Sequence, residues 1–283
     1  MSALPETELA AAIDQLVTLA LAEDVGDGDV TGARVVPLDL VFTGVIAARE
    51  PMVVAGLPFA ESVFHRVVPD VRFEARVKDG DRVTPGTVLA RLEGQARGLL
   101  TAERTALNLL QHLSGIATLT RRYADAIAES EAILLDTRKT IPGLRRLAKY
   151  ATKLGGAQNH RMGLYDGVLI KDNHIAVCGG VTEAVRRAKA ATTLPVEVEC
   201  DRLDQVADAL AAGADILLLD NMTTAQLREA VALIAGKAKT EASGGVTLET
   251  IAGIAATGVD YISVGRLTQS APAIDIGLDW ETQ

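Results

Sequence analysis

Eight lysine and arginine side chains fall within one 34-residue stretch of this sequence, between positions 138 and 171. They are Arg138, Lys139, Arg145, Arg146, Lys149, Lys153, Arg161 and Lys171. His160 lies among them and Asp166 is the only carboxylate, so the stretch has a formal charge of +7, whereas the whole chain carries −9. An acidic protein that gathers its cations in one region is suited to hold a strongly anionic ligand there.

Composition narrows the kind of anion. Proteins that track a phosphate backbone usually have a basic domain with a high pI, and binders of single strands add aromatic stacking platforms. Here the pI is about 5.0 and only 3% of the residues are aromatic, so a small, multiply charged metabolite is favoured over nucleic acid. For Arg145, Arg146, Lys149 and Lys153, which have helical spacing, a solvated helix face is the alternative.

The sequence predicts neither a membrane segment nor a secretion signal. No apolar run reaches the roughly eighteen residues that a membrane-spanning helix needs. The N-terminal residues MSALPETELAAAIDQL lack a basic segment followed by an apolar one, as a signal peptide would have. Cys178 and Cys200 share no metal-binding spacing, and reduced thiols are the default for such a chain. We therefore expect a cytoplasmic protein without a membrane partner.

Hydrophobic patterning divides the chain into two kinds of region. Residues 6–24 predict a helix, 41–95 contain short β-type runs with a helix at 58–67, and 101–128 predict a long helix interrupted near Ser114-Gly115. From about residue 130, apolar strands alternate with amphipathic helices, which predicts βαβ units and a parallel sheet. The predicted strands are 132–136, 167–171, 195–200, 215–220, 239–243 and 260–265, and the helices between them are 143–155, 180–192, 203–212, 223–235 and 247–256.

Every predicted strand of the second region ends in a polar residue or a glycine. Thr137, Arg138 and Lys139 follow the first strand, and the others end at or near Lys171, Glu199, Asp220, Ser243 and Gly265. In α/β barrels the active groups collect at the C-terminal ends of the strands, whereas an open sheet places its ligand at one switch point. Contributors from all six strands therefore favour a barrel.

These strand ends indicate specific chemistry. Ser243, Gly244, Gly245 and Gly265 offer backbone N–H groups to a phosphate, with ordinary loop glycines as the alternative. Two further strand ends, Glu199 and Asp220, supply oxygen ligands of the kind that hold Mg²⁺ together with substrate phosphates, with salt bridges to the clustered lysines as the alternative. Glu197 shares a strand face with Glu199 and is a candidate partner for a lysine or arginine.

The four histidines have different predicted roles. His160 stands beside Arg161 and is a candidate ligand contact. His174 either takes part in binding or caps the loop after Lys171. His65 and His112 fall in helical patterns and are expected to be structural.

Several strings of this sequence resemble the quinolinate phosphoribosyltransferase family. They are DTRKT (136–140), GGAQNHRMGLYDGVLIKDNHI (155–175), VEVE (196–199), LLLDNM (217–222) and SGG (243–245). The likeness covers almost the whole chain, from residue 23 to residue 279. The reaction it implies converts quinolinate and phosphoribosyl pyrophosphate into nicotinate mononucleotide, pyrophosphate and CO₂.

The resemblance also implies an architecture. We expect an N-terminal helical segment (1–24), an α/β sandwich (25–115), an incomplete parallel α/β barrel (116–266) of six or seven strands, and a C-terminal segment (267–283) that returns toward the sandwich. The family resemblance implies a homodimer in which the sandwich of one subunit completes the barrel site of the other.

Residue roles follow from the same resemblance. Arg138, His160, Arg161 and Lys171 are expected to bind the quinolinate carboxylates, with Arg104 arriving from the partner subunit. Lys139 and Lys171 are expected to contact the phosphoribosyl donor, and Glu199 and Asp220 to contact its Mg²⁺ or its ribose hydroxyls. These four residues form the predicted catalytic set. The predicted substrate-binding set is completed by Thr137, Ser243, Gly244, Gly245, Val264, Gly265 and Arg266.

Some positions depart from the family pattern, and other functions stay open at this point. Ile141 and Ala157 stand where the family often has threonine and glycine, and Arg266 and Gln269 stand where it often has a small residue and a histidine. The alternatives are a paralogous group associated with molybdenum transport, another phosphosugar barrel enzyme, a non-catalytic sensor of phosphorylated metabolites and, least favoured, a carrier sheet formed by residues 77–94.

Overall fold

The structure is a computed structural model that describes residues 6–281. The chain forms two compact units. The first takes the chain up to Arg121 together with Pro142–Gly155 and the segment from Ser270, and the second takes Arg122–Ile141 and Gly156–Gln269. Residues 142–155 were predicted to belong to the barrel domain, but they are part of the first unit. Four of the eight clustered cations, Arg145, Arg146, Lys149 and Lys153, lie in this segment.

The first unit is built on an antiparallel sheet of order β12-β1-β5-β3. These strands are β1 (Val41–Ala48), β3 (Arg72–Ala75), β5 (Val88–Gln95) and β12 (Ile276–Trp280), while β2 (Met52–Val53) pairs with β4 (Arg82–Val83). Its helices are α1 (Glu6–Val25), α2 (Gly32–Val35), α3 (Leu57–Val67), α5 (Arg145–Gly155) and most of α4 (Ala96–Ala126). The C-terminal segment returns to this unit, because β12 pairs with β1.

The predicted break in the long helix at Ser114-Gly115 is wrong, because α4 runs through both residues. The Ser114 hydroxyl accepts from the Ala55 N–H (3.0 Å) and donates to the Ala55 carbonyl (3.2 Å), so it ties the helix to the chain beside β2. A side chain at Gly115 would collide with the Pro272 carbonyl. The two residues that suggested an interruption therefore allow close packing on one helix face.

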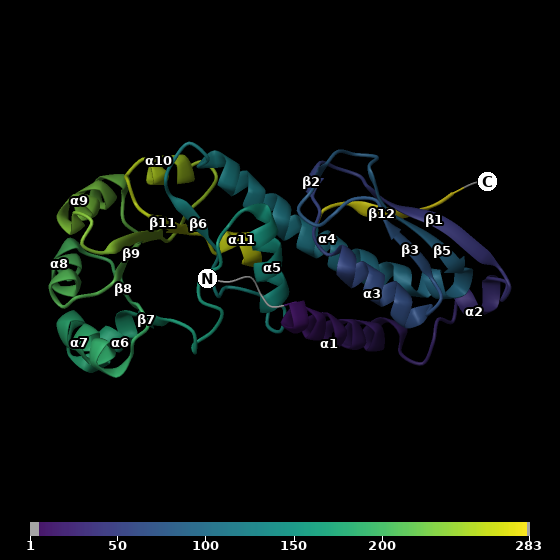
Figure 1. Ribbon diagram of the computed structural model, residues 1–283, viewed down its shortest axis with the longest axis horizontal. Coiled ribbons are helices and arrows are strands. Elements are labelled where there is room, and N and C mark those ends of the chain that lie inside the picture. Colours follow the sequence, from purple (N-terminus) through teal and green to yellow (C-terminus); the bar gives the residue numbers. More distant parts are fainter. Residues whose placement is uncertain (1–5, 282–283) are drawn as a thin grey trace. The chain divides into compact units, whose positions relative to one another are not determined.

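The second unit is a parallel sheet of order β6-β11-β10-β9-β8-β7. The strands are β6 (Ile133–Leu135), β7 (Val168–Ile170), β8 (Val196–Cys200), β9 (Ile216–Asp220), β10 (Lys239–Ser243) and β11 (Tyr261–Ser263), which confirms all six predicted strands. The helices are α6 (Asp172–Cys178), α7 (Val181–Ala191), α8 (Leu203–Ala211), α9 (Thr224–Ile234), α10 (Ile251–Ala255) and α11 (Arg266–Gln269), of which α6 and α11 are absent from the sequence prediction. Figure 1 shows α7 to α10 along the outer side of this sheet.

The strand order is that of an incomplete barrel. Strands β7 to β11 are neighbours in sequence order, and β6, the first strand of this unit, follows β11 without a reversal. Strands β6 and β7 are the two edges. Gln158 forms a parallel bridge with Leu135 of β6, through hydrogen bonds from the Gln158 N–H to the Leu134 carbonyl (2.8 Å) and from the Asp136 N–H to the Gln158 carbonyl (3.2 Å). The chain just before β7 thus lies along the β6 edge.

Alternation along the strands separates core residues from site residues. On β8 the buried Val196 and Val198 alternate with Glu197 and Glu199, because successive side chains of a strand point to opposite faces. Helices α7 and α8 pack against β8, which accounts for its apolar face. The carboxylates occupy the other face. Within residues 6–281, no helix combines the length and apolar character that a membrane crossing requires.

Candidate active site

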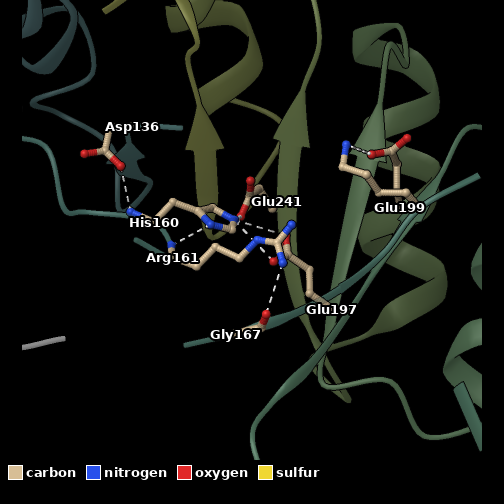
Figure 2. Close-up of polar contacts among 8 residues, drawn as sticks. Asp136, His160, Arg161, Gly167, Glu197, Glu199 and Glu241 are labelled. Atoms are coloured by element: carbon tan, nitrogen blue, oxygen red, sulfur yellow. Dashed lines mark hydrogen bonds and ion pairs between the residues drawn. The ribbon is translucent and has the colours of Figure 1, made fainter. Parts of the chain in front are cut away.

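The most densely connected part of the second unit surrounds His160, in the segment before β7. Figure 2 shows its ring between Glu197 of β8 and Glu241 of β10, with Asp136, just after β6, near its backbone. The Nε2 atom lies 3.2 Å from a Glu197 carboxyl oxygen and 3.5 Å from a Glu241 carboxyl oxygen. The other ring nitrogen, Nδ1, accepts the Arg161 N–H at 2.7 Å. Both ring nitrogens therefore have partners inside the protein.

Two influences oppose each other at this imidazole. Burial alone would lower the pKa of His160, but hydrogen bonds and charge interactions with Glu197 and Glu241 outweigh burial and raise this pKa. The Nε2 atom faces the carboxyl pair as a donor, and Nδ1 lies within hydrogen-bond distance of the Arg161 N–H. Burial raises the pKa of Glu197, and His160 opposes that rise.

Asp136 anchors the backbone of the same segment. Its carboxylate accepts the His160 N–H at 2.9 Å and the Asn159 side-chain amide at 2.7 Å, and its side chain is fully buried. The Arg161 side chain then extends to the Gly167 carbonyl, 3.1 Å away. Residues 159–161 are thus held at the end of β6, between β8 and β10, and at the start of β7.

Arg161 and Arg138 form the cationic part of this region. Burial lowers the pKa of Arg161, and the positive charge of Arg138 lowers it further, while Glu197 and Asp166 act in the opposite direction. Two guanidinium groups that repel each other at a half-buried position form a pair that a carboxylate could bridge, because a bound anion would relieve the repulsion. The structure thus brings these two predicted site residues together.

Lys171 and Glu199 form an ion pair at the ends of β7 and β8. The Lys171 ammonium lies 2.8 Å from a Glu199 carboxyl oxygen. This is the salt-bridge alternative for Glu199 that the sequence left open. His174 accepts the Lys171 N–H at 2.9 Å and so closes the first turn of α6. The capping role predicted as one of two options for His174 is therefore present.

Asp220 and the glycine loop meet at the ends of β9 and β10. Ser243 pairs in register with Asp220, and the Asn221 N–H donates to the Ser243 carbonyl at 2.9 Å. The Asn221 amide also donates to the Asp220 carboxylate at 2.5 Å. Gly244 and Gly245 both have positive φ, which glycine adopts without strain. The loop is open at Gly245, whereas Gly244 packs closely against Asn221, and the loop lies close to a carboxylate.

Lys139 reaches the last strand end. A side chain at Gly265 would meet the Lys139 Cδ atom, so the lysine stem lies directly over this glycine. The Thr268 hydroxyl donates to the Lys139 carbonyl at 2.6 Å, and the Lys139 N–H donates to the Thr137 hydroxyl at 3.0 Å. Val264, just before Gly265, is buried. Arg266 is exposed, and its positive charge helps to lower the pKa of Glu249.

The remaining predicted cations lie in the first unit. Arg104 is exposed on α4. On α5, Arg146 and Lys153 are exposed, and Arg146 pairs with Glu8 at 3.3 Å, as expected of a solvated helix face. Lys149 differs, because its side chain is fully buried.

The sequence interpretation missed Glu241 and the role of Asp136. Glu241 lies two residues before Ser243 on β10 and therefore faces the same side as the predicted phosphate loop. That spacing was visible in the sequence, but its partner His160 lies 81 positions earlier in the chain. Glu197, predicted to pair with a lysine or arginine, contacts His160 instead, although its charge also affects Arg161.

Metal ligation is possible at two places. Within residues 6–281, His160, Glu197 and Glu241 are the one group of three whose ligand atoms all lie within 4.8 Å of one another. The predicted Mg²⁺ ligands Glu199 and Asp220 end adjacent strands, and carboxylate oxygens are the ligands that Mg²⁺ prefers. The donor set at these two strand ends therefore fits that ion.

Comparisons with known proteins give the family. The models of the C-terminal and N-terminal domains of quinolinate phosphoribosyl transferase match residues 116–279 and 29–114. A nicotinate-nucleotide pyrophosphorylase (carboxylating) of Mycobacterium leprae is 47% identical over 98% of this chain and 99% of its own length. A probable enzyme of the same name in Bacillus subtilis is 42% identical over 94% of this chain and 93% of its own.

A solved structure gives the same result for the fold. The nicotinate-nucleotide pyrophosphorylase of Francisella tularensis superposes with a TM-score of 0.93 at 41% identity, and the match covers 96% of each chain. With an antiparallel sheet in the first unit, an incomplete parallel barrel in the second and both domain models matched, the chain belongs to the quinolinate phosphoribosyltransferase family.

Proposed function

We propose that this protein transfers the phosphoribosyl group of phosphoribosyl pyrophosphate to quinolinate and removes the 2-carboxylate. The products are nicotinate mononucleotide, pyrophosphate and CO₂, and a proton takes the place of the lost carboxylate on the ring. The observation that carries this proposal is the pair Arg138 and Arg161 at one end of the barrel of a chain that matches both family domains. The proposal also assigns the protein to NAD biosynthesis and to the cytoplasm.

The acceptor side of the site is assigned to Arg138, Arg161 and Lys171, with His160 beside them. Quinolinate is a dianion and the donor carries several phosphates, so bringing them together costs several kcal/mol of Coulomb repulsion at an intermediate dielectric. Charge-assisted hydrogen bonds of about 1.5–3 kcal/mol each offset this repulsion. Arginine suits the carboxylates because its planar fork binds both oxygens at once.

The donor side is assigned to the strand ends that carry Lys139 and the glycine loop. We assign the backbone N–H groups of Ser243–Gly245 and Gly265 to the 5′-phosphate, with Thr137, Val264 and Arg266 around them. Glu199 and Asp220 would hold Mg²⁺, which neutralises the departing pyrophosphate when it is bound. In this proposal the ion pair between Lys171 and Glu199 breaks when substrate binds, and the Lys171 ammonium then contacts the substrate.

Catalysis in this proposal rests on positioning and electrostatics, not on a covalent nucleophile. Positive charge develops on the ribose as pyrophosphate leaves, and the carboxylates of Glu199 and Asp220 face that charge. The pyridine nitrogen attacks the ribose, and its new positive charge draws the electrons released when the C–CO₂ bond breaks. Arg138 and Arg161 hold the ring in place throughout.

The decisive experiment measures ¹⁴CO₂ released from quinolinate labelled in its 2-carboxylate. Release must require both phosphoribosyl pyrophosphate and Mg²⁺, and chelation must abolish it. Lys139→Ala and Arg161→Ala should each lower turnover at least about 100-fold with the fold intact, whereas Lys153→Ala, an exposed cation on α5, should leave it unchanged. Wild-type kinetics in either site variant would remove the assignment. Binding without turnover would indicate a sensor.

The same proposal includes a homodimer whose sites are shared between subunits, with Arg104 supplied by the partner. Mixing inactive Arg104→Ala and Lys139→Ala subunits tests this directly. A shared site predicts that each mixed dimer has one complete site, so mixed dimers should have about half of the wild-type activity. A random mixture of the two subunits should then have about a quarter. Mixtures that stay inactive, or a monomer of full activity, would contradict it.

A further inference from the structure

We propose that Glu241 is a positioning residue: through the imidazole of His160, it fixes Arg161 for binding of the anionic ring substrate. The inference rests on the proposed function, which assigns Arg161 to a quinolinate carboxylate. It extends that function to a residue on β10 that has no place in the substrate assignments above.

Glu241 is where a barrel interior would normally hold an apolar side chain. Branched apolar residues usually fill the layers of an α/β barrel, yet this carboxyl group is only 2% exposed. One of its oxygens lies 3.5 Å from His160 Nε2, and the other, Oε1, has no hydrogen-bond partner among the described residues. A buried oxygen without a partner destabilises a fold, so the retention of a carboxyl group here calls for a functional reason.

The carboxyl group reaches Arg161 through one side chain. Glu241 and Glu197 come from β10 and β8, which are separated by β9, and together they receive the Nε2 side of the His160 ring. The opposite nitrogen accepts the Arg161 N–H at 2.7 Å. A ring that is fixed at Nε2 therefore fixes the backbone of Arg161.

The segment that carries Arg161 depends on such side-chain contacts, because it lies at the open side of the barrel. Strands β6 and β7 are the sheet edges, and Gln158 forms a single bridge to β6. Beyond Gln158, contacts to Asp136, the carboxyl pair and Gly167 help to hold His160 and Arg161. Loosening the ring should therefore displace Arg161 more than the rest of the barrel.

A metal ion is the rival explanation for the same three side chains. Metal ligation needs a lone pair on Nε2, which places the ring proton on Nδ1. In this structure Nδ1 lies 2.7 Å from the Arg161 backbone nitrogen, an arrangement that favours a proton on Nε2 over a lone pair there. Arg161 and Arg138 are close enough to affect each other's charge. Two positive groups near the ring oppose the binding of a further positive ion. The geometry points to a positioning role.

The test compares Glu241→Leu, which removes the acceptor, with Glu241→Gln, whose amide oxygen still accepts from Nε2. Steady-state kinetics should show the KM for quinolinate raised at least about 10-fold in the leucine variant, with the KM for phosphoribosyl pyrophosphate within about 2-fold. The glutamine variant should stay within about 3-fold of wild type for both. Equal losses in both variants and for both substrates, with lowered thermal stability, would show a structural role only and overturn the inference.

A double-mutant cycle with His160→Phe tests the route. If Glu241 acts through His160, adding Glu241→Leu to His160→Phe should change the KM for quinolinate by less than about 2-fold. If Glu241→Leu raised the KM for quinolinate as much in the His160→Phe protein as in wild type, Glu241 would not act through His160. Stoichiometric zinc or manganese that is retained by the purified wild type and lost from Glu241→Gln would support the metal instead.

Amide hydrogen exchange separates this inference from the proposed function. The Arg161 N–H should exchange at least about 10-fold faster in Glu241→Leu than in wild type, and at an unchanged rate in Glu241→Gln, because its acceptor is the His160 ring. This readout needs no substrate. A wild type without donor-dependent CO₂ release would remove the proposed function alone, whereas unchanged exchange in the leucine variant would remove the positioning role of Glu241.

Discussion

Gly265 gives the sharpest test of the donor side of the site. Its φ is not in the positive range, so alanine is acceptable to the backbone. A Cβ atom there would lie 2.9 Å from Lys139 Cδ and 3.7 Å from both Thr137 Oγ1 and Gln269 Oε1. The Lys139 backbone is held by Thr268, so the flexible lysine stem has to move. Gly265→Ala should therefore act on the protein mainly by displacing one ammonium group.

The size of the effect follows from the interaction that is lost. A charge-assisted hydrogen bond contributes about 1.5–3 kcal/mol, so kcat/KM for phosphoribosyl pyrophosphate should fall about 10- to 100-fold. The KM for quinolinate and the melting temperature should hardly change. Gly253→Ala is the matched control, because nothing lies within 4 Å of its added methyl group. It should keep full activity and, within α10, stabilise the fold by about 0.5–1 kcal/mol.

A double variant decides whether Lys139 is the cause. In a Lys139→Ala background, Gly265→Ala should have no further effect on kcat/KM, because the displaced group is already absent. Wild-type donor kinetics in Gly265→Ala, or an undiminished loss in the Lys139→Ala background, would refute the reasoning.

Three further substitutions separate stability from binding. Gly244→Ala should lower the free energy of unfolding by about 1–3 kcal/mol in urea titrations, because Gly244 has a φ of 92° and its Cβ would collide with Asn221. Arg161→Lys keeps the charge but loses the planar fork, so the KM for quinolinate should rise about 10-fold or more while that for the donor stays near wild type. Thr223→Ala removes the cap that accepts the Gln226 N–H at the start of α9 and should cost about 1 kcal/mol of stability with activity unchanged.

The strands of the second unit were predictable because local signals agree along them. AILLD, DILLLD and DYISVG each combine a short apolar run with a polar residue or a glycine at the end, and helical patterns of suitable length separate them. Such βαβ units admit a parallel sheet and right-handed connections. The barrel, rather than an open sheet, followed from a polar residue or a glycine at every strand end, and the strand order bears this out.

The long helix and the basic stretch show where local signals fail. Ser114 and Gly115 have low helix propensity, but their neighbours in space, Ala55 and Pro272, are distant in sequence. The basic stretch looked like one feature because its members are close in sequence. The structure assigns α5 to the first unit and the remaining cations to the second, so a single run of charge serves two environments.

The contacts of His160 show which parts of the site the sequence could predict and which it could not. Residue types identified His160 and Arg161, since cations beside a histidine suit an anion. The sequence did not identify Glu197 and Glu241 as their partners. These residues lie on β8 and β10, which are not adjacent strands because β9 lies between them. An incomplete barrel leaves a side without ladder hydrogen bonds, and here side chains from Asp136, Glu197 and Glu241 hold the chain in place of a strand. The placement of Arg161 therefore depends on side chains from separate strand regions, so loosening one of these contacts should disturb Arg161 before the rest of the barrel.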